Sequence, residues 1–441
     1  MLCIRVAKAM QDLLTTRAEE VASETGCSQR ASKLGGMGLV QTLVFGYLKD
    51  RLASCEDLAQ TAATAGYPVS PQAIDQRCTP AAAECLRRLV EEAVKVAIAA
   101  EENLTPLLDR FTAVCPQDSS TVSLPDAMED HWRGCDTSTG CGGRSALKIQ
   151  VRCDLVRGGI VGLRLEHGRD NDHRTPLQTE DIQEGSLHLR DLGYFELDVL
   201  RQIGEKKAYF LTRLQDGTAV FRSDGQRIEL AKYLRKQKGN VVDEPVTLGV
   251  EDRLPCRLVA IRVPPEVARR RRQQVLEKAR KKQYTPSADK LYLCAWNFYV
   301  TNAPEEMLSV AEVLVLARMR WQIELIFKLW KSHGGLGHTR SKKPWRILCE
   351  VFAKLLAQLI QHWILIQACW HCPQLSLRKA AKAVRAFAAS LAAQLRKLDA
   401  MAQTLETIAQ TVAHVARVNK RRRHPSAYQL LVDPITYGYA T

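Results

Sequence analysis

Apolar residues recur at helical spacing through the first quarter of the chain. Leu39, Leu43, Val44 and Leu48 share one helix face, and residues 81–100 continue with the same period. The alternation of apolar and polar residues that is typical of a strand does not occur in this segment. Residues 1–105 are therefore predicted to be helical.

The pattern changes near residue 110, where short runs of β-branched and apolar residues alternate with turn residues. Strands are predicted at residues 111–124, 146–155, 160–166, 187–190 and 208–214, and a helix at residues 195–203. Strands followed by strand–helix alternation predict an α/β core.

The next segment, residues 215–305, is predicted to be rich in strands again. It contains a hairpin signal at residues 219–230, where Ser-Asp-Gly-Gln separates two apolar runs, and a strong strand pattern at residues 291–301. From about residue 308 onward the pattern is helical.

Composition and charge narrow the class of protein. The chain has 441 residues, of which 46% are hydrophobic and 25% are charged, so it is globular and long enough for two or three domains. Lys and Arg exceed Asp and Glu by 63 to 48, a formal net charge of +15. Such a charge favours nucleic acid, an anionic membrane or acidic substrates as partners.

A membrane is excluded as the partner by two features. The first residues contain no secretory signal, and the most apolar long stretch, residues 352–370, is interrupted by Lys354, Gln358, Gln361 and His362, which predicts a buried helix. The 14 cysteines are scattered, which is typical of reduced thiols in a cytoplasmic protein. Cys369 and Cys372 form a C-x-x-C pair without a second pair at zinc spacing, which favours core cysteines over a metal site.

Residues 317–331 predict a helix with one charged stripe. At 100° per residue, Arg320, Glu324, Lys328 and Lys331 fall within a narrow arc, and apolar side chains occupy most of the remaining circumference. Two interpretations stay open. The stripe is either a solvated face with i,i+4 ion pairs or a site where a carboxylate binds a metal and the cations bind a phosphate.

Two further acids lie where a predicted strand ends or turns, namely Asp118 and Asp191. Taken singly, an aspartate at a strand end is most often a turn former or a helix cap. Together with Glu324, however, the two aspartates provide carboxylates from separate elements. A two-metal site for phosphodiester chemistry requires such a cluster, because Mg²⁺ prefers hard oxygen ligands.

These acids stand in motifs that resemble the DDE transposases of bacterial insertion sequences, in the branch with a Tyr-Arg-Glu-Lys signature and a β-insertion. Asp118-Ser-Ser resembles the first catalytic block, Asp191-Leu-Gly-Tyr-Phe the second, and Arg320-Trp-Gln-Ile-Glu324 the third. Lys331 keeps the spacing of seven residues after the glutamate, with Lys328 between them. The chain departs from the signature at one position, where Ala317 replaces the tyrosine.

The resemblance assigns roles to these residues and extends to others. Asp118, Asp191 and Glu324 take the catalytic and metal-binding roles, with two Mg²⁺ or Mn²⁺ ions as cofactor. Arg320, Lys328 and Lys331 are expected to contact DNA. Arg213, in the strand after the second aspartate, matches a phosphate-contacting arginine of the family.

Two DNA-contact expectations have an alternative. Trp296 matches a base-stacking tryptophan of a hairpin-forming relative, but an aromatic residue in a strand also fits the core. A basic stretch at residues 269–282, which includes Arg269, Arg270, Arg271 and Arg272, either neutralises DNA phosphates or is a solvated face. A second basic cluster covers residues 417–424.

The fold implied by the resemblance is a ribonuclease-H-like α/β core with a β-rich insertion, flanked by helical N-terminal and C-terminal regions. The expected divisions are a DNA-end-binding region at 1–105, the first part of the core at 106–214, the insertion at 215–305, the helix of Glu324 at 306–350, and the C-terminal region at 351–441.

The activity implied is metal-dependent cleavage and strand transfer of an insertion sequence. The expected partners are double-stranded DNA, both terminal inverted repeats and target, and a second copy of the chain in a synaptic complex. Two alternatives stay open, a related nuclease that cuts without joining and a decayed DNA-binding relative.

Overall fold

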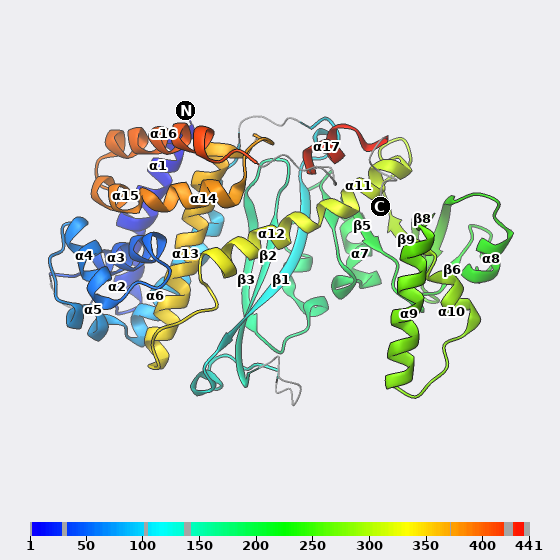
Figure 1. Ribbon diagram of the computed structural model, residues 1–441, viewed down its shortest axis with the longest axis horizontal. Coiled ribbons are helices and arrows are strands. Elements are labelled where there is room, and N and C mark those ends of the chain that lie inside the picture. Colours follow the sequence, from blue (N-terminus) through cyan, green and yellow to red (C-terminus); the bar gives the residue numbers. More distant parts are fainter. Residues whose placement is uncertain are drawn as a thin grey trace. The chain divides into compact units, whose positions relative to one another are not determined.

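A computed structural model describes residues 2–28, 33–100, 105–135, 143–370, 372–418 and 427–435 (Figure 1). The chain divides into two compact units. The first comprises Met1–Leu104, Asp118–Asp170 and Gln322–Arg422, and the second comprises Thr105–Gln117, Asn171–Trp321 and Arg423–Thr441. The chain therefore passes from one unit to the other several times.

The N-terminal part of the first unit is helical. Its helices are α1 (Leu2–Asp12), α2 (Ala18–Glu24), α3 (Gly36–Lys49), α4 (Cys55–Thr64), α5 (Pro71–Arg77) and α6 (Pro80–Lys95), with a π-helical turn, Leu13–Arg17, between the first two. Local sequence explains where several of them begin. Ser54, Ser70 and Thr79 each accept a backbone N–H at the start of a helix, and proline follows Ser70 and Thr79 at the first helical position.

The long helix α13 (Pro344–Cys369) packs against α1, α3, α6, α14 (Leu377–Ala386) and α16 (Leu398–Val415). Short helix α15 (Ala388–Gln394) completes this part of the unit. Within the described residues, α13 is the one helix long and apolar enough to cross a membrane, and its most apolar window is entirely buried. The predicted buried helix is thus the centre of the first unit's packing.

A buried histidine in α13 makes the stability of the first unit depend on pH. His362 Nε2 lies 2.7 Å from the Gly158 carbonyl oxygen, so the neutral ring donates there. Burial lowers the pKa of His362, and this hydrogen bond opposes the shift. At pH values between the folded pKa and about 6.5, the unfolded chain therefore binds more protons than the folded chain. The free energy of unfolding decreases as the pH falls through this range.

We expect the thermal unfolding midpoint of the wild type to decrease when the pH is lowered from about 7 to about 5. The midpoint of His362→Gln should decrease less over the same change of pH. The glutamine keeps a donor for Gly158 but cannot become charged. Calorimetry or circular dichroism at several pH values provides the measurement. Equal pH dependence in the two proteins would contradict the assignment.

The strands form a mixed arrangement around β1 (Val114–Leu124), which contributes residues to both units. In the first unit the order is β3-β2-β1, with β2 (Ser145–Cys153) and β3 (Ile160–His167) antiparallel. In the second unit the order is β1-β4-β5-β9-β8-β7-β6. These strands are β4 (Leu187–Leu189), β5 (Tyr209–Arg213), β6 (Val220–Phe221), β7 (Val241–Leu248), β8 (Leu254–Arg262) and β9 (Trp296–Thr301).

Strand direction separates two parts of the second unit. β1, β4 and β5 run parallel, whereas β9, β8, β7 and β6 continue the sheet with antiparallel pairs. The predicted mixed α/β class is therefore confirmed. The segment between the hydrogen-bonded strands β5 and β9 holds β6–β8, α8 (Leu230–Lys236), α9 (Pro265–Lys281) and α10 (Ala288–Leu293).

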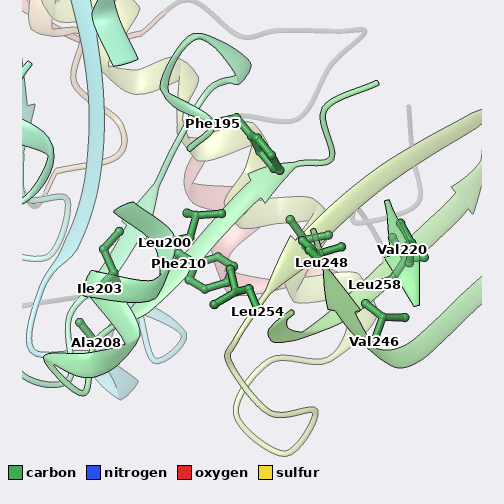
Figure 2. Packing of buried hydrophobic residues seen from close by; sticks show 11 residues of the cluster. Phe195, Leu200, Ile203, Ala208, Phe210, Val220, Val246, Leu248, Leu254 and Leu258 are labelled. Carbon is green, nitrogen blue, oxygen red and sulfur yellow. The ribbon is translucent and has the colours of Figure 1, made fainter. Parts of the chain in front are cut away.

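One hydrophobic cluster joins the parallel and antiparallel parts of the second unit (Figure 2). Leu200 and Ile203 from α7 (Leu197–Glu205) pack with Phe210 from β5 and with Leu258 from β8, and all four are almost fully buried. The cluster fixes β5 against its neighbours, and β5 ends at Arg213.

The sequence prediction was wrong over the first part of residues 291–301. Leu291 to Leu293 belong to α10, which begins after Ser287, whose side chain accepts the Lys290 N–H, and the strand starts only at Trp296. A short apolar run does not distinguish a helix end from a strand, so the cap residue was the more specific signal. The last helix of the described residues is α17 (Ala427–Val432), and most of the basic cluster at 417–424 lies outside those residues.

Candidate active site

Asp118 and Asp191 follow equivalent positions on two adjacent parallel strands. The ladder between β1 and β4 pairs Val114 with Leu187 and ends with Pro116 opposite Leu189. Each aspartate comes two residues after that last pair. The carboxyl end of a parallel ladder is where ligands bind in α/β proteins.

The two aspartates have different local surroundings. Asp118 Oδ1 accepts the Ser119 backbone N–H at 2.8 Å, within β1. Asp191 precedes a 3₁₀ turn, Leu192–Tyr194, and its side chain is 42% exposed. Arg320 Nε lies 4.0 Å from Asp191 Oδ1, so a cation of the third motif neighbours the acid of the second.

The predicted helix of the third motif is divided into three pieces. α11 (Val310–Met319) ends before Arg320, α12 (Trp321–Lys328) carries Glu324, and a π-helical turn, Leu329–His333, carries Lys331. The angle of 100° per residue therefore does not hold as far as Lys331, because a π-helix bonds residue i to i+5. Ala317 is half-buried in α11.

The apolar coverage of α12 is also narrower than predicted. Ile323, Ile326 and Phe327 are buried, but Trp321 is 57% exposed and Leu325 is 41% exposed. Glu324 is half-buried and Lys328 is exposed.

Lys331 contacts the strand of the first aspartate. Its Nζ donates to the Thr121 carbonyl oxygen at 2.8 Å, and Thr121 stands three residues after Asp118 in β1. The carbonyls that follow Lys331 are held by cations, because Arg51 donates to Ser332 O and Arg385 Nη1 donates to His333 O at 2.7 Å. The π-helical turn thus ends against fixed donors.

Arg213 stands at the exposed end of β5, opposite Tyr299 of β9. Burial raises the pKa of Tyr299, and the positive charges of Arg213, Arg318 and Arg271 oppose this shift. Burial also lowers the pKa of Arg271 and of Arg318, with Arg213 adding to the effect on Arg271. The charges of three arginines therefore act on this one phenol.

Trp296 lies in the core rather than at the surface. Its side chain is 3% exposed and packs with Leu234 and Ala260, and its indole N–H is buried without an acceptor among the described residues. Base stacking by Trp296 stays a prediction, and it requires the ring to leave this position.

The four consecutive arginines of α9, residues 269–272, divide into two pairs. Arg271 donates to the Trp296 carbonyl and to Asn297 Oδ1, and Arg272 Nε donates to the Leu291 carbonyl at 2.9 Å. Arg269 and Arg270 are exposed. The inner pair therefore holds α9 against β9 and α10, and the outer pair is available for phosphates.

We expect Arg269→Gln/Arg270→Gln to flatten the dependence of log K for DNA on log salt by up to about 1.8, since each phosphate contact contributes about 0.9. Arg272→Gln is the matched control and should leave the slope unchanged, because Arg272 is bound to the backbone. Fluorescence anisotropy over a salt series measures the slope. An unchanged slope in the double variant would assign the outer pair to the solvated surface.

The donor set suits a hard divalent cation, because Asp118, Asp191 and Glu324 offer only carboxylate oxygens. Over the described residues, no group of three or more His, Cys, Asp or Glu side chains is placed closely enough to hold a metal ion. The chemistry of the acids therefore fits a metal, while their grouping around one stays a prediction.

The buried polar residues directly before both aspartates were not predicted from the sequence. Gln117 is fully buried and Arg190 is 2% exposed, and the Arg190 guanidinium donates to Gln117 Oε1. A charged residue inside the LHLRD strand pattern was the available signal, because arginine is almost never fully buried without a partner.

Comparisons with known proteins converge on one family. The family described as Transposase DDE domain matches residues 110–360. The transposase for insertion sequence element IS231F of Bacillus thuringiensis subsp. israelensis is 28% identical over 365 residues, which cover 77% of this chain and 75% of the relative. The transposase for insertion sequence element IS1151 of Clostridium perfringens is 24% identical over 318 residues, covering 66% of each chain.

Proposed function

The chain belongs to the transposase DDE domain family, whose members cleave and transfer DNA strands with a divalent metal, and we propose the residues that perform this activity here. Asp118, Asp191 and Glu324 are the catalytic acids and the metal ligands. The observation that carries this proposal is the equal spacing of Asp118 and Asp191 after the last pair of β1 and β4. The contact between Arg320 and Asp191 supports the third motif's place in the same set.

Two Mg²⁺ ions, which Mn²⁺ can replace, are proposed as the cofactor. When bound, they supply Lewis acidity at the attacking and leaving oxygens of the phosphodiester. The side chains of the chain itself bind and orient the DNA. Arg213, Arg320 and Lys331 hold the phosphate in line and Lys328 contacts the DNA, because fixed charge and positioning carry most of the catalysis in phosphoryl transfer.

The proposed fold is a ribonuclease-H-like core with an insertion. The strand orders β3-β2-β1 and β1-β4-β5, and the parallel pairing of the last three strands, support the core. The return of the chain to β5 through β9, after about 80 residues of other structure, supports an insertion at 215–305.

DNA is the substrate of this family, and the terminal inverted repeats and target DNA are its proposed forms here. We propose that the helical N-terminal region binds the repeats and that two copies of the chain meet in the synaptic complex. The net charge of +15 favours binding of the protein to both the inverted repeats and the target DNA. The proposed location is the cytoplasm, on the chromosome.

A joining assay tests the proposal. A DNA end of the element with a free 3′-hydroxyl is mixed with the protein, target plasmid and Mg²⁺, and joined product is expected, with none in EDTA. Cleavage of an uncut end without joining of the pre-cut one would identify a nuclease. Ala317 favours a third outcome, the decayed relative, which would bind ends and neither cut nor join them.

A further inference from the structure

A buried polar network includes the residues directly before the two aspartates in the sequence, Gln117 and Arg190, and all of its members belong to the second unit. Arg190 donates to Gln117 Oε1 and, through Nη2, to the Gln178 carbonyl oxygen at 2.9 Å. The same Nη2 lies 3.4 Å from His188 Nδ1, and His188 Nε2 lies 2.9 Å from Ser186 Oγ. The exposed fraction of each of these five side chains is at most 2%.

The network joins three neighbouring strands at the end of the parallel ladder. Gln117 follows the last paired residue of β1 and Arg190 follows the last paired residue of β4. The Arg190 backbone N–H donates to the Leu211 carbonyl of β5 at 3.0 Å. The hydrogen bond between the Arg190 and Gln117 side chains, called here the Arg190–Gln117 bridge, therefore connects β1 and β4 one residue beyond their last backbone pair.

A buried guanidinium is a costly way to hold two strands together. Burial of a charge is offset only by well-placed hydrogen bonds, and apolar residues of similar volume give equal or greater stability. The bridge stands one residue before Asp118 and one before Asp191. The buried charge therefore stands at the two strand ends that lead directly into the proposed acids.

We infer that Arg190 is a positioning residue that fixes the ends of β1 and β4 for divalent metal binding by Asp118 and Asp191. This inference rests on the proposed function, because it takes the two acids as ligands. Outer partners that orient metal-binding groups raise metal affinity by about 10- to 100-fold. Gln117 acts with Arg190, since its amide oxygen receives the guanidinium.

Metal binding can be measured directly, without activity. Mn²⁺ is titrated into the full-length protein, and the free ion is followed by its electron paramagnetic resonance signal. Arg190→Lys is expected to weaken Mn²⁺ binding by about tenfold, because an ammonium cannot serve Gln117 and Gln178 in one plane.

Arg257→Lys is the matched control. Arg257 is a partly buried arginine of the second unit, which binds Asp243 through two nitrogens and the Ala303 and Leu308 carbonyls. Its side chain is 11% exposed. We expect Arg257→Lys to lower the unfolding midpoint and to leave Mn²⁺ affinity within about twofold of wild type, since Arg257 lies in β8, which β5 and β9 separate from β4 in the sheet.

Two further variants make the result decisive. Gln117→Asn shortens the side chain that carries the acceptor oxygen and should also weaken Mn²⁺ binding. This variant serves as the test if Arg190→Lys does not fold. Asp191→Asn tests the ligand set itself. Unchanged Mn²⁺ affinity in folded Arg190→Lys or Gln117→Asn, with loss in Asp191→Asn, would overturn the inference alone. Unchanged affinity in Asp191→Asn would instead overturn the proposed ligands.

Discussion

Replacement of Asp118 or Asp191 by Asn, or of Glu324 by Gln, is expected to reduce DNA cleavage by at least about a thousandfold. Each replacement keeps the shape of the side chain and removes the negative charge that a divalent cation requires. A metal ion contributes several kcal/mol to the stabilisation of a phosphoryl-transfer transition state, and each 1.36 kcal/mol changes the rate tenfold.

Binding of the DNA end should change little in the same variants, since Arg213, Arg269 and Arg270 are untouched. Cleavage of a labelled end in Mg²⁺ measures the first effect, and a gel-shift titration measures the second. Asp198→Asn is the control, because Asp198 is an exposed acid of α7 that pairs with Arg201 on the surface. Near-normal cleavage by one of the three variants would remove that acid from the site.

The second large effect concerns the buried ion pair within α13. Lys354 Nζ lies 2.7 Å from Glu350 Oε1 and also donates to the His338 carbonyl at 2.7 Å, and neither charged side chain is more than 2% exposed. Burial lowers the pKa of Lys354, and Glu350 opposes the shift. Loss of one partner leaves the other charge buried and unpaired, which costs about 3–5 kcal/mol.

Lys354→Met should therefore lower the free energy of unfolding of the first unit by that amount. The double variant Lys354→Met/Glu350→Leu should regain most of it, because an apolar pair of similar volume needs no counter-charge. Arg87→Met is the control for a solvent-accessible pair, with an expected loss of at most about 1 kcal/mol, since Arg87 pairs with Glu84 and Glu91 on a partly exposed face of α6. Urea unfolding followed by circular dichroism compares them. Equal losses in the single and double variants would contradict the prediction.

The parts of the fold that follow local pattern were predictable from the sequence. β2, β3 and β5 lie where β-branched and apolar runs predict them, and α7 lies where its helical period predicts it. The catalytic role of the two aspartates was predicted from the order of the three acids and the resemblance of their motifs, and it stays a prediction, although the structure places both aspartates two residues after the last pair of β1 and β4. Pattern did not distinguish the end of α10 from the start of β9, because both segments are short and apolar.

Long-range contacts account for what the sequence did not reveal. Arg271 donates to the carbonyl of residue 296, and Arg272 donates to the carbonyl of residue 291. Neither contact can be predicted from the spacing of the basic residues. The bridge from Arg190 to Gln117 spans 73 residues. The helix of Glu324 is divided where Arg51 and Arg385, from distant segments of the chain, donate to the carbonyls of Ser332 and His333.

The position of α13 has a consequence for synthesis of the protein. α13 packs on α3 and α6, yet it ends at residue 369, which is 274 residues after the end of α6 at residue 95. At about 5–20 residues per second, a ribosome needs about 14–55 s to make that stretch. Throughout this time the apolar faces of α3 and α6 that pack on α13 lack this partner, because α13 has not been synthesised completely. The first unit therefore completes its folding late in translation, and the early helices are where a chaperone has the longest opportunity to bind.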